Sequence, residues 1–169
     1  MGMLEYKEIF FRIIFSTIVG GIIGFERERS HKSAGLRTNA MVAMGSTLIT
    51  VIALSAFEEY PMADPTRIIS NIIVGIGFLG GGAILHEGHR IHGLTTAATL
   101  WVVAAIGIVI GVGFYKEAIF ATGIVYFILT VLWLVEKKSH DRFLYRSLRG
   151  EKESEAAAAV DNNRSSTNG

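Results

Sequence analysis

Long apolar runs separated by short polar segments dominate the chain and predict membrane-spanning helices. A bilayer core about 30 Å thick needs roughly 20 apolar residues per helix. We expect five such helices, near residues 9–25, 40–57, 68–85, 94–114 and 117–135. A transmembrane β-barrel would need segments of about ten residues with alternating polarity, and these runs are longer and continuously apolar. The pattern predicts an all-α membrane protein: a bundle of about five transmembrane helices with short loops, in residues 1–138.

Lysine and arginine gather after the first and the fifth run, which predicts the orientation in the membrane. They are Arg27, Arg29, Lys32 and Arg37 in the first group, and Lys137, Lys138, Arg142, Arg146 and Arg149 in the second. Five spans place both groups on one side, so we expect the N-terminus outside and the C-terminus in the cytoplasm. No small-residue cleavage signature precedes the charged segment that begins at Glu26, which argues against a removable signal peptide.

The last residues change character, and we treat 139–169 as a cytoplasmic tail. Arg142 and Arg146 alternate with Phe143, Leu144 and Leu148, a pattern typical of a short amphipathic helix on the membrane surface. The polar stretch beyond it predicts disorder.

Composition narrows the functional classes. Half of the 169 residues are hydrophobic, which fits a bilayer protein, and the net charge of +1 gives no basic field that would attract nucleic acid. The chain has no cysteine, so disulfides, thiolate metal sites and thiol nucleophiles are excluded. We also find no arrangement of a nucleophile and a base. We therefore expect no enzyme, no cofactor and no bound metal.

Glycines four residues apart occur in three of the predicted helices, where they favour close helix packing. The pairs are Gly20 and Gly24, Gly77 and Gly81, and Gly107 and Gly111. The segment from Gly75 to Gly80 also matches a dinucleotide-binding pattern, but it lies inside an apolar run instead of between a strand and a helix. Packing is the favoured interpretation, and it predicts a compact bundle that associates with itself or with another membrane protein in the lipid bilayer.

Polar residues form a stripe at the start of the third predicted helix. Asp64, Arg67, Asn71 and Gly75 share one helix face, and Asp64 followed by Pro65 is typical of a helix start. Two readings stay open: a cap with helix–helix hydrogen bonds, or a ligand or ion pathway. Arg12 in the first helix either snorkels to the outer headgroups or pairs with Asp64.

A second group of polar residues lies where the first helix meets the second. Glu26 and Arg27 end one helix, and Arg37 and Thr38 open the next. The arginines alone are explained by the excess of cations on the cytoplasmic side of a membrane protein. The glutamates are not, because acidic groups at a helix C-terminus oppose the helix dipole and need a cationic partner. We expect Arg37 or Arg90 to pair with Glu26 or Glu28.

The fourth helix begins close to a histidine-rich segment. Thr95 and Thr96 open this helix, and the hydroxyls of Thr95 and Thr99, four residues apart, can bind the backbone or a neighbouring helix. The preceding segment, 86–92, holds three histidines but lacks the spacing of the metal-binding helix motif. We expect it to be a solvated, pH-sensitive loop.

Three blocks of sequence resemble the MgtC/SapB family of bacterial membrane proteins. They read GGIIGFERERSHKSAGLRTNAMVAMGSTL at 20–48, DPTRIISNIIVGIGFLGGGAIL at 64–85 and GLTTAATLWVVAAIGIVIGVG at 93–113. The resemblance carries over the motif positions Glu26, Arg27, Gly35, Arg37, Thr38, Asp64, Arg67, Gly77, Gly80, Thr95, Thr96 and Trp101.

The resemblance implies a protein of the cytoplasmic membrane that is linked to magnesium-regulated genes. It also implies that the protein acts mainly on other membrane machines, including the F-type ATP synthase, and less as a carrier of Mg²⁺. The chain departs from the family pattern at Gly81, where the family usually has alanine, and its tail is shorter than that of the MgtC-like virulence proteins. The shorter SapB-like branch is therefore the closer comparison. We expect a non-enzymatic regulator or interaction protein, with a small ion or solute conduit as the alternative.

Overall fold

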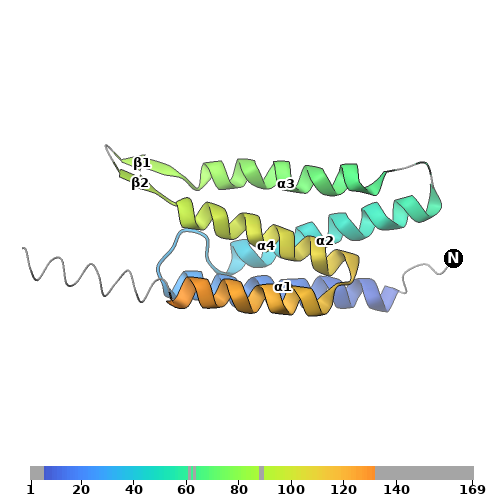
Figure 1. Cartoon of the computed structure of the whole chain (residues 1–169), viewed down its shortest axis with the longest axis horizontal. Helices are drawn as coiled ribbons and strands as arrows, with labels where there is room; N and C mark the ends of the chain where they lie inside the picture. The colour runs from blue at the N-terminus through green and yellow to red at the C-terminus, as the bar shows by residue number, and fades with distance from the viewer. Residues whose placement is uncertain (1–5, 61, 63, 88–89, 132–169) are drawn as a thin grey trace, which may run out of the picture. The chain divides into compact units, whose positions relative to one another are not determined.

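The computed structural model describes residues 6–60, 62, 64–87 and 90–131, and it divides the chain into two units at residue 126. Everything below concerns the first unit unless stated. Its elements, drawn in Figure 1, are α1 (Tyr6–Arg29), α2 (Leu36–Glu59), α3 (Pro65–Gly82), β1 (Leu85–Glu87), β2 (Arg90–His92) and α4 (Leu94–Val112). Residues 115–131 are also helical, and the last five of them belong to the second unit.

The predicted helical membrane architecture is confirmed. Among the described residues, three helices are long and apolar enough to cross a bilayer: Tyr6–Arg29, Leu36–Phe57 and Leu94–Val112. Neither α3 nor the described part of the fifth helix is among them, so the number of spans stays a prediction. The predicted tail, 139–169, lies outside the described residues.

Two helices differ in length from the predicted apolar runs. Helix α1 continues to Arg29, beyond the predicted end at 25, because Glu26 and Arg27 are buried and paired instead of solvated. Helix α3 ends at Gly82, where three successive glycines weaken the helix and the Ala83 amide donates to the carbonyl of Gly80 at 3.1 Å.

The segment expected to be a loop forms a short antiparallel hairpin. Strands β1 and β2 pair Leu85 with His92, His86 with Ile91 and Glu87 with Arg90. The connection between the strands is two residues long in the sequence and contains Gly88, which is a recognised hairpin signal that the reading of the histidines overlooked.

Glycines bring α1, α2 and α4 into close contact. A Cβ added to Gly20 would lie 2.5 Å from the Asn39 carbonyl oxygen, and one added to Gly107 would lie 2.5 Å from that of Ala43. Gly24 and Gly111 lie equally close to α2, against Leu36 and Thr50. Helix α2 therefore packs between α1 and α4 at backbone contact distance.

The third glycine pair behaves differently from the expectation. A Cβ added to Gly77 or Gly81 would meet no atom of another element within 4 Å, whereas one added to Gly80 would lie 3.5 Å from the Ala97 Cβ of α4. Helix α3 packs on the unit through the face that carries Ile72, Ile76 and Gly80, so the Gly77 face points outward.

Candidate functional site

Two arginines are buried at opposite ends of α1. Arg12 is 6% exposed and Arg27 is 2% exposed, although both belong to a helix that is long and apolar enough to span a bilayer. They share the buried face of α1 with Ser16, Val19 and Ile23. Because ionisable side chains are expensive inside a membrane and usually functional, these two positions are the natural starting points for a site.

Arg12 ties α1 to the end of α4. Its Nη1 donates to the Gly111 carbonyl oxygen at 2.5 Å, and its Nη2 donates to Glu8 Oε1 at 2.5 Å. The Gly111 carbonyl belongs to the last turn of α4, where carbonyl groups lack partners within the helix. Arg12 therefore acts as a C-terminal cap supplied by another helix, beside the aromatic rings of Phe11, Phe15 and Tyr115.

Both sequence-based readings of Arg12 are wrong in this structure. The side chain does not snorkel, because it is buried, and it does not pair with Asp64, because its partners are Glu8 and Gly111. Asp64 is exposed, and its Oδ1 accepts hydrogen bonds from the amide of Thr66 at 2.9 Å and from the Thr66 hydroxyl at 2.6 Å. The hydroxyl bond, followed by the amide bond, lowers the pKa of Asp64 below its usual value.

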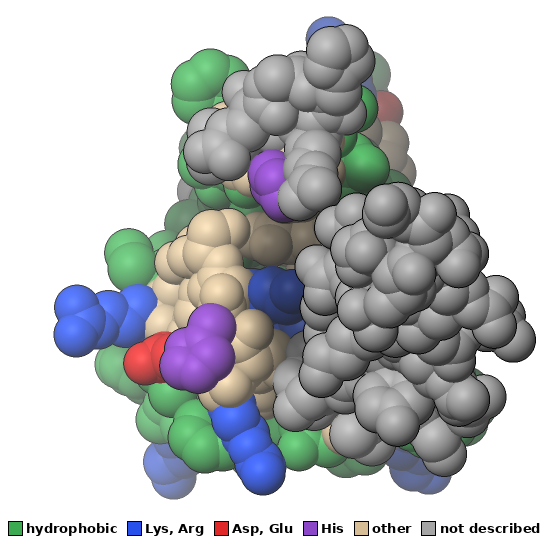
Figure 2. All heavy atoms as spheres, turned by 90° about the vertical axis from the view of Figure 1, so that its left-hand side faces the viewer, with side chains coloured by type: hydrophobic (Ala, Val, Ile, Leu, Met, Phe, Trp, Pro, Cys, Tyr) green, Lys and Arg blue, Asp and Glu red, His purple; other side chains and the backbone are tan. Residues whose placement is uncertain are grey.

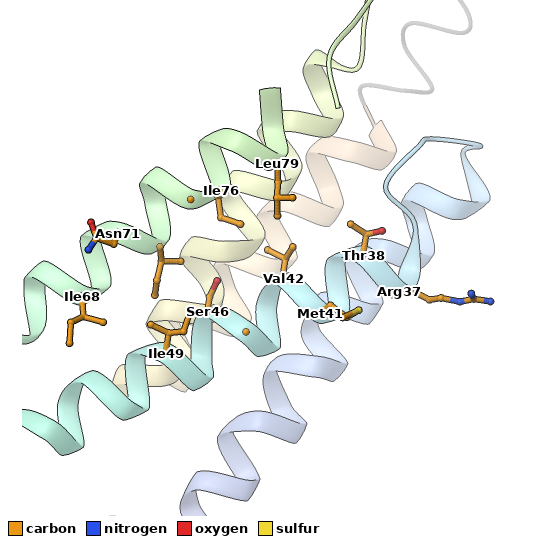
Figure 3. Close-up of a pocket in the computed structure, with 13 residues that line it drawn as sticks. Arg37, Thr38, Met41, Val42, Ser46, Ile49, Ile68, Asn71, Ile76 and Leu79 are labelled. Carbon is orange, nitrogen blue, oxygen red and sulfur yellow. The ribbon is translucent and has the colours of Figure 1, made fainter. Parts of the chain in front are cut away.

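The predicted polar stripe on α3 is divided between two environments. Asp64 caps the helix, as one of the two readings proposed, and Arg67 in the first turn is exposed. Asn71 and Gly75 instead line a groove of about 620 Å³ between α2 and α3, together with Arg37 and Thr38 from α2 (Figure 3).

The second buried arginine forms a compact polar cluster at the other end of α1. Arg27 Nε donates to Glu26 Oε2 at 2.8 Å, and the Ser30 hydroxyl donates to Glu26 Oε1 at 2.8 Å. Arg27 Nη1 is buried and has no hydrogen-bond partner among the described residues. The expected pairing of these glutamates with Arg37 is wrong: Glu28 accepts from the Leu36 amide at 3.0 Å, and Arg37 is exposed. Glu26 is paired with its neighbour Arg27 and Glu28 with a backbone amide, so neither glutamate is paired with Arg37.

Residues from the loop and from α4 complete this end of the unit. Thr96 is buried, and its hydroxyl lies 3.5 Å from that of Ser33 as a hydrogen-bond acceptor. Thr95 is exposed, and its carbonyl accepts from the hydroxyl of Thr99 at 2.7 Å. The helix entry therefore contributes one buried threonine, Thr96, whose hydroxyl bond to Ser33 ties α4 to the loop after α1.

Sequence reasoning missed Asn39, although it is completely buried. Its Nδ2 donates to the carbonyls of Ala34 and Gly35, at 2.8 and 2.9 Å, and so fixes the turn into α2. An asparagine inside an apolar helix is the signal that could have revealed it, since buried amides need partners.

An apolar layer separates the two arginines. Val19 and Ile23 of α1 and Val103, Ile106 and Ile110 of α4 are all buried. Buried hydroxyl groups also lie at this depth, and those of Ser16, Thr47 and Thr50 donate to the backbone carbonyls of Ile13, Gly107 and Ser46, at 2.9, 2.7 and 2.8 Å. Within the described part of the chain, no group of three or more His, Asp or Glu residues could hold a metal ion. The geometry is that of a closed bundle with a charged residue at each end.

Comparisons with known proteins agree with the motif blocks. A family model described as the MgtC family matches residues 13–138. The putative magnesium transporter YhiD of Escherichia coli K12 is 40% identical over 129 residues, which cover 73% of this chain and 60% of the relative. Protein SapB of Bacillus subtilis is 36% identical over 151 residues, covering 84% and 64%.

A third relative, protein MgtC of Brucella abortus, is 46% identical over 105 residues, which cover 62% of this chain and 43% of that protein. The chain thus spans less than two thirds of the length of these relatives. No solved structure matches the chain significantly.

Proposed function

The chain belongs to the MgtC family, and from this premise we propose that it is a non-enzymatic membrane protein that regulates, or binds to, other membrane machinery linked to magnesium homeostasis. The magnesium link rests on the name of the Escherichia coli relative, a putative magnesium transporter. We place the protein in a bacterial cytoplasmic membrane, with the N-terminus outside and the C-terminus inside.

The closed apolar layer between Arg12 and Arg27 is the observation that carries this proposal. Ile23, Val103 and Ile110 are almost fully buried there, which supports an interior without a hydrated path between the two polar ends in the described part of the chain. Magnesium ions keep several waters and bind carboxylate oxygens, and the carboxylates at the two ends of α1, Glu8 and Glu26, are already paired with Arg12 and Arg27. A protein that acts through contact with a partner fits this interior better than a cation carrier.

The outward face of α3 offers a surface for such contact. Phe78 is 84% exposed and Val74 is 73% exposed, and a Cβ added to Gly77 or Gly81 beside them would meet no atom of another element within 4 Å. Small residues four apart let a second helix approach closely inside a bilayer. We propose that a partner, either another membrane protein or a second copy, docks on this face.

Site-specific crosslinking in native membranes tests the docking proposal. A photo-crosslinking amino acid replaces Phe78 in one variant and Phe120 in a control variant. Phe120 is 72% exposed but lies on the fifth helix. We expect a discrete protein adduct from position 78 alone, and its loss when Gly77→Leu is added. Equal adducts from both positions, or lipid adducts alone, would contradict the proposal.

A small ion or solute transporter remains the alternative, and one observation favours it. Arg12 Nε and Arg27 Nη1 are buried donors without a partner in the described residues, and intramembrane ionisable groups commonly mark substrate pathways. Flux into vesicles that contain the purified chain separates the two functions. The regulator predicts no Mg²⁺ uptake above that of protein-free vesicles, whereas the transporter predicts uptake that Arg27→Gln abolishes.

A further inference from the structure

The groove between α2 and α3 is open, elongated and almost entirely apolar. Its walls include Met41, Val42 and Ile49 from α2, and Ile68, Ile76 and Leu79 from α3. Figure 3 shows Ile76 and Leu79 facing Val42 across the groove, with Arg37 at one end and Ile68 near the other. A Cβ added to Gly45 or Gly75, which also line it, would meet no atom within 4 Å. The groove therefore has room for an apolar occupant.

The length of the groove matches one leaflet of a membrane. Its lining runs from Arg37 to Ile49 on α2 and from Ile68 to Leu79 on α3. At 1.5 Å of rise per residue, these stretches are about 18 Å and about 17 Å long. Half of a hydrocarbon core about 30 Å thick is about 15 Å. An acyl chain that follows the groove would therefore end near the middle of the bilayer.

The end of the groove at Arg37 carries positive charge. The exposed charged residues between α1's end and α2's start are Glu28, Arg29, Lys32 and Arg37, three cations against one anion. Figure 2 faces this end of the molecule and shows Lys and Arg side chains projecting from it. Glu28 is already engaged by the Leu36 amide, and Arg37 forms no ion pair with any described residue.

The first turn of α2 adds unpaired donors at the same place. Gly35, the residue before the helix, supplies no side-chain cap, and the first turn holds no acidic residue. The amides of Arg37 and Thr38 have no acceptor within the described part of the chain. Amides at a helix N-terminus favour anions, and phosphate oxygens are well suited to them.

From the apolar groove and the cations at its end, we propose that an anionic phospholipid binds here, with one acyl chain between α2 and α3 and its phosphate against Arg37 and the start of α2. The lipid comes from the leaflet on the side of the loop between α1 and α2. A lipid without net charge or a passing helix would fill the apolar walls but would leave the net positive charge at the Arg37 end unbalanced. This lipid site is separate from the docking face of α3 proposed above.

Native mass spectrometry of the full chain in mild detergent tests the site. We would titrate phosphatidylglycerol and, in parallel, phosphatidylcholine with the same acyl chains. We expect one tightly bound phosphatidylglycerol per chain, about tenfold tighter than phosphatidylcholine, since both carry a phosphate but the choline cation of phosphatidylcholine is repelled by the cations at this end of the groove. Arg37→Gln should remove this preference, and Gly45→Leu should weaken both lipids by filling the groove.

Two matched variants serve as controls. Arg67→Gln removes an exposed cation at the start of α3 that does not line the groove, and Gly21→Leu adds a side chain at another glycine with open space around it. Both should bind phosphatidylglycerol as the unmodified chain does. Equal binding of the two lipids, or an unchanged preference in Arg37→Gln, would overturn the proposal. A Gly45→Leu variant that keeps its lipid but loses a protein subunit would show that a helix fills the groove instead.

Discussion

Arg12 connects three segments of the first unit through one guanidinium group. It binds Glu8 one turn earlier in α1 and the carbonyl of Gly111 at the end of α4. Its Nη2 also lies close to Gly113 in the turn that follows, where an added Cβ would be 3.2 Å away. A sequence shows that such an arginine must have a partner, but a backbone carbonyl from a distant helix leaves no mark in the sequence. That is why pairing with the more visible charge of Asp64 was expected and was wrong.

Replacing Arg12 should therefore destabilise the bundle. Arg12→Ala leaves the Gly111 carbonyl without its donor, and an unsatisfied buried group costs about 1–3 kcal/mol. Reversible unfolding in detergent, followed by circular dichroism, measures this loss. Arg67→Ala removes an exposed arginine and should change the free energy of unfolding by less than about 0.5 kcal/mol. Equal stability of the two variants would argue against the capping role of Arg12.

Asp64 provides a prediction on pH. The hydrogen bonds from Thr66 lower its pKa in the folded state below the usual 3.8. The carboxylate therefore supports the start of α3 fully at pH values above 3.8, and this support disappears as the pH falls through the lowered pKa. Nuclear magnetic resonance titration of the Asp64 carboxyl, with and without Thr66→Val, measures the effect. The pKa should rise toward its usual value in the variant, which keeps the backbone amide at position 66 but loses the hydroxyl, and an unchanged pKa would contradict the contribution of the hydroxyl bond.

At the scale of the helices, identical glycine spacings have different roles. The sequence predicts close packing equally at Gly20, Gly77 and Gly107, because the spacing gives a face but not what lies opposite it. In the structure, two of these faces meet α2 at backbone distance, and that of Gly77 is open. The partners of Arg12 and Glu26 were not predicted for a related reason, since a local pattern does not identify the neighbour of a side chain. The hairpin of β1 and β2 is different, because its short connection with Gly88 is a local signal that was overlooked.

A matched pair of alanine substitutions tests this distinction. In Gly107→Ala the new Cβ would lie 2.5 Å from the Ala43 carbonyl oxygen, so α2 and α4 must separate, at a cost of about 1–3 kcal/mol. In Gly77→Ala there is open space, and alanine's better helix propensity should leave the isolated chain as stable or slightly more stable. Thermal unfolding in detergent compares them, and a larger loss at Gly77 would contradict the packing described here.

At the scale of the molecule, the sequence was sufficient for the fold class and the family. Long apolar runs indicated a helical membrane protein, and the motif blocks around Glu26, Asp64 and Thr95 identified the MgtC family. The arrangement of polar residues into two separate ends, with a closed layer between them, required the structure. That layer is why we favour a protein that acts by contact over one that conducts ions.

The absence of native cysteines allows the most direct test of this closed layer. Single-cysteine variants Ile23→Cys and Val103→Cys place a thiol within the layer, and Lys32→Cys places one on the exposed loop. A membrane-impermeant, water-soluble thiol reagent is then applied to each side of native membranes, with and without Mg²⁺. We predict labelling of the Lys32→Cys variant from one side and none of the other two. Labelling of Ile23→Cys or Val103→Cys would show water in the core and contradict a closed bundle.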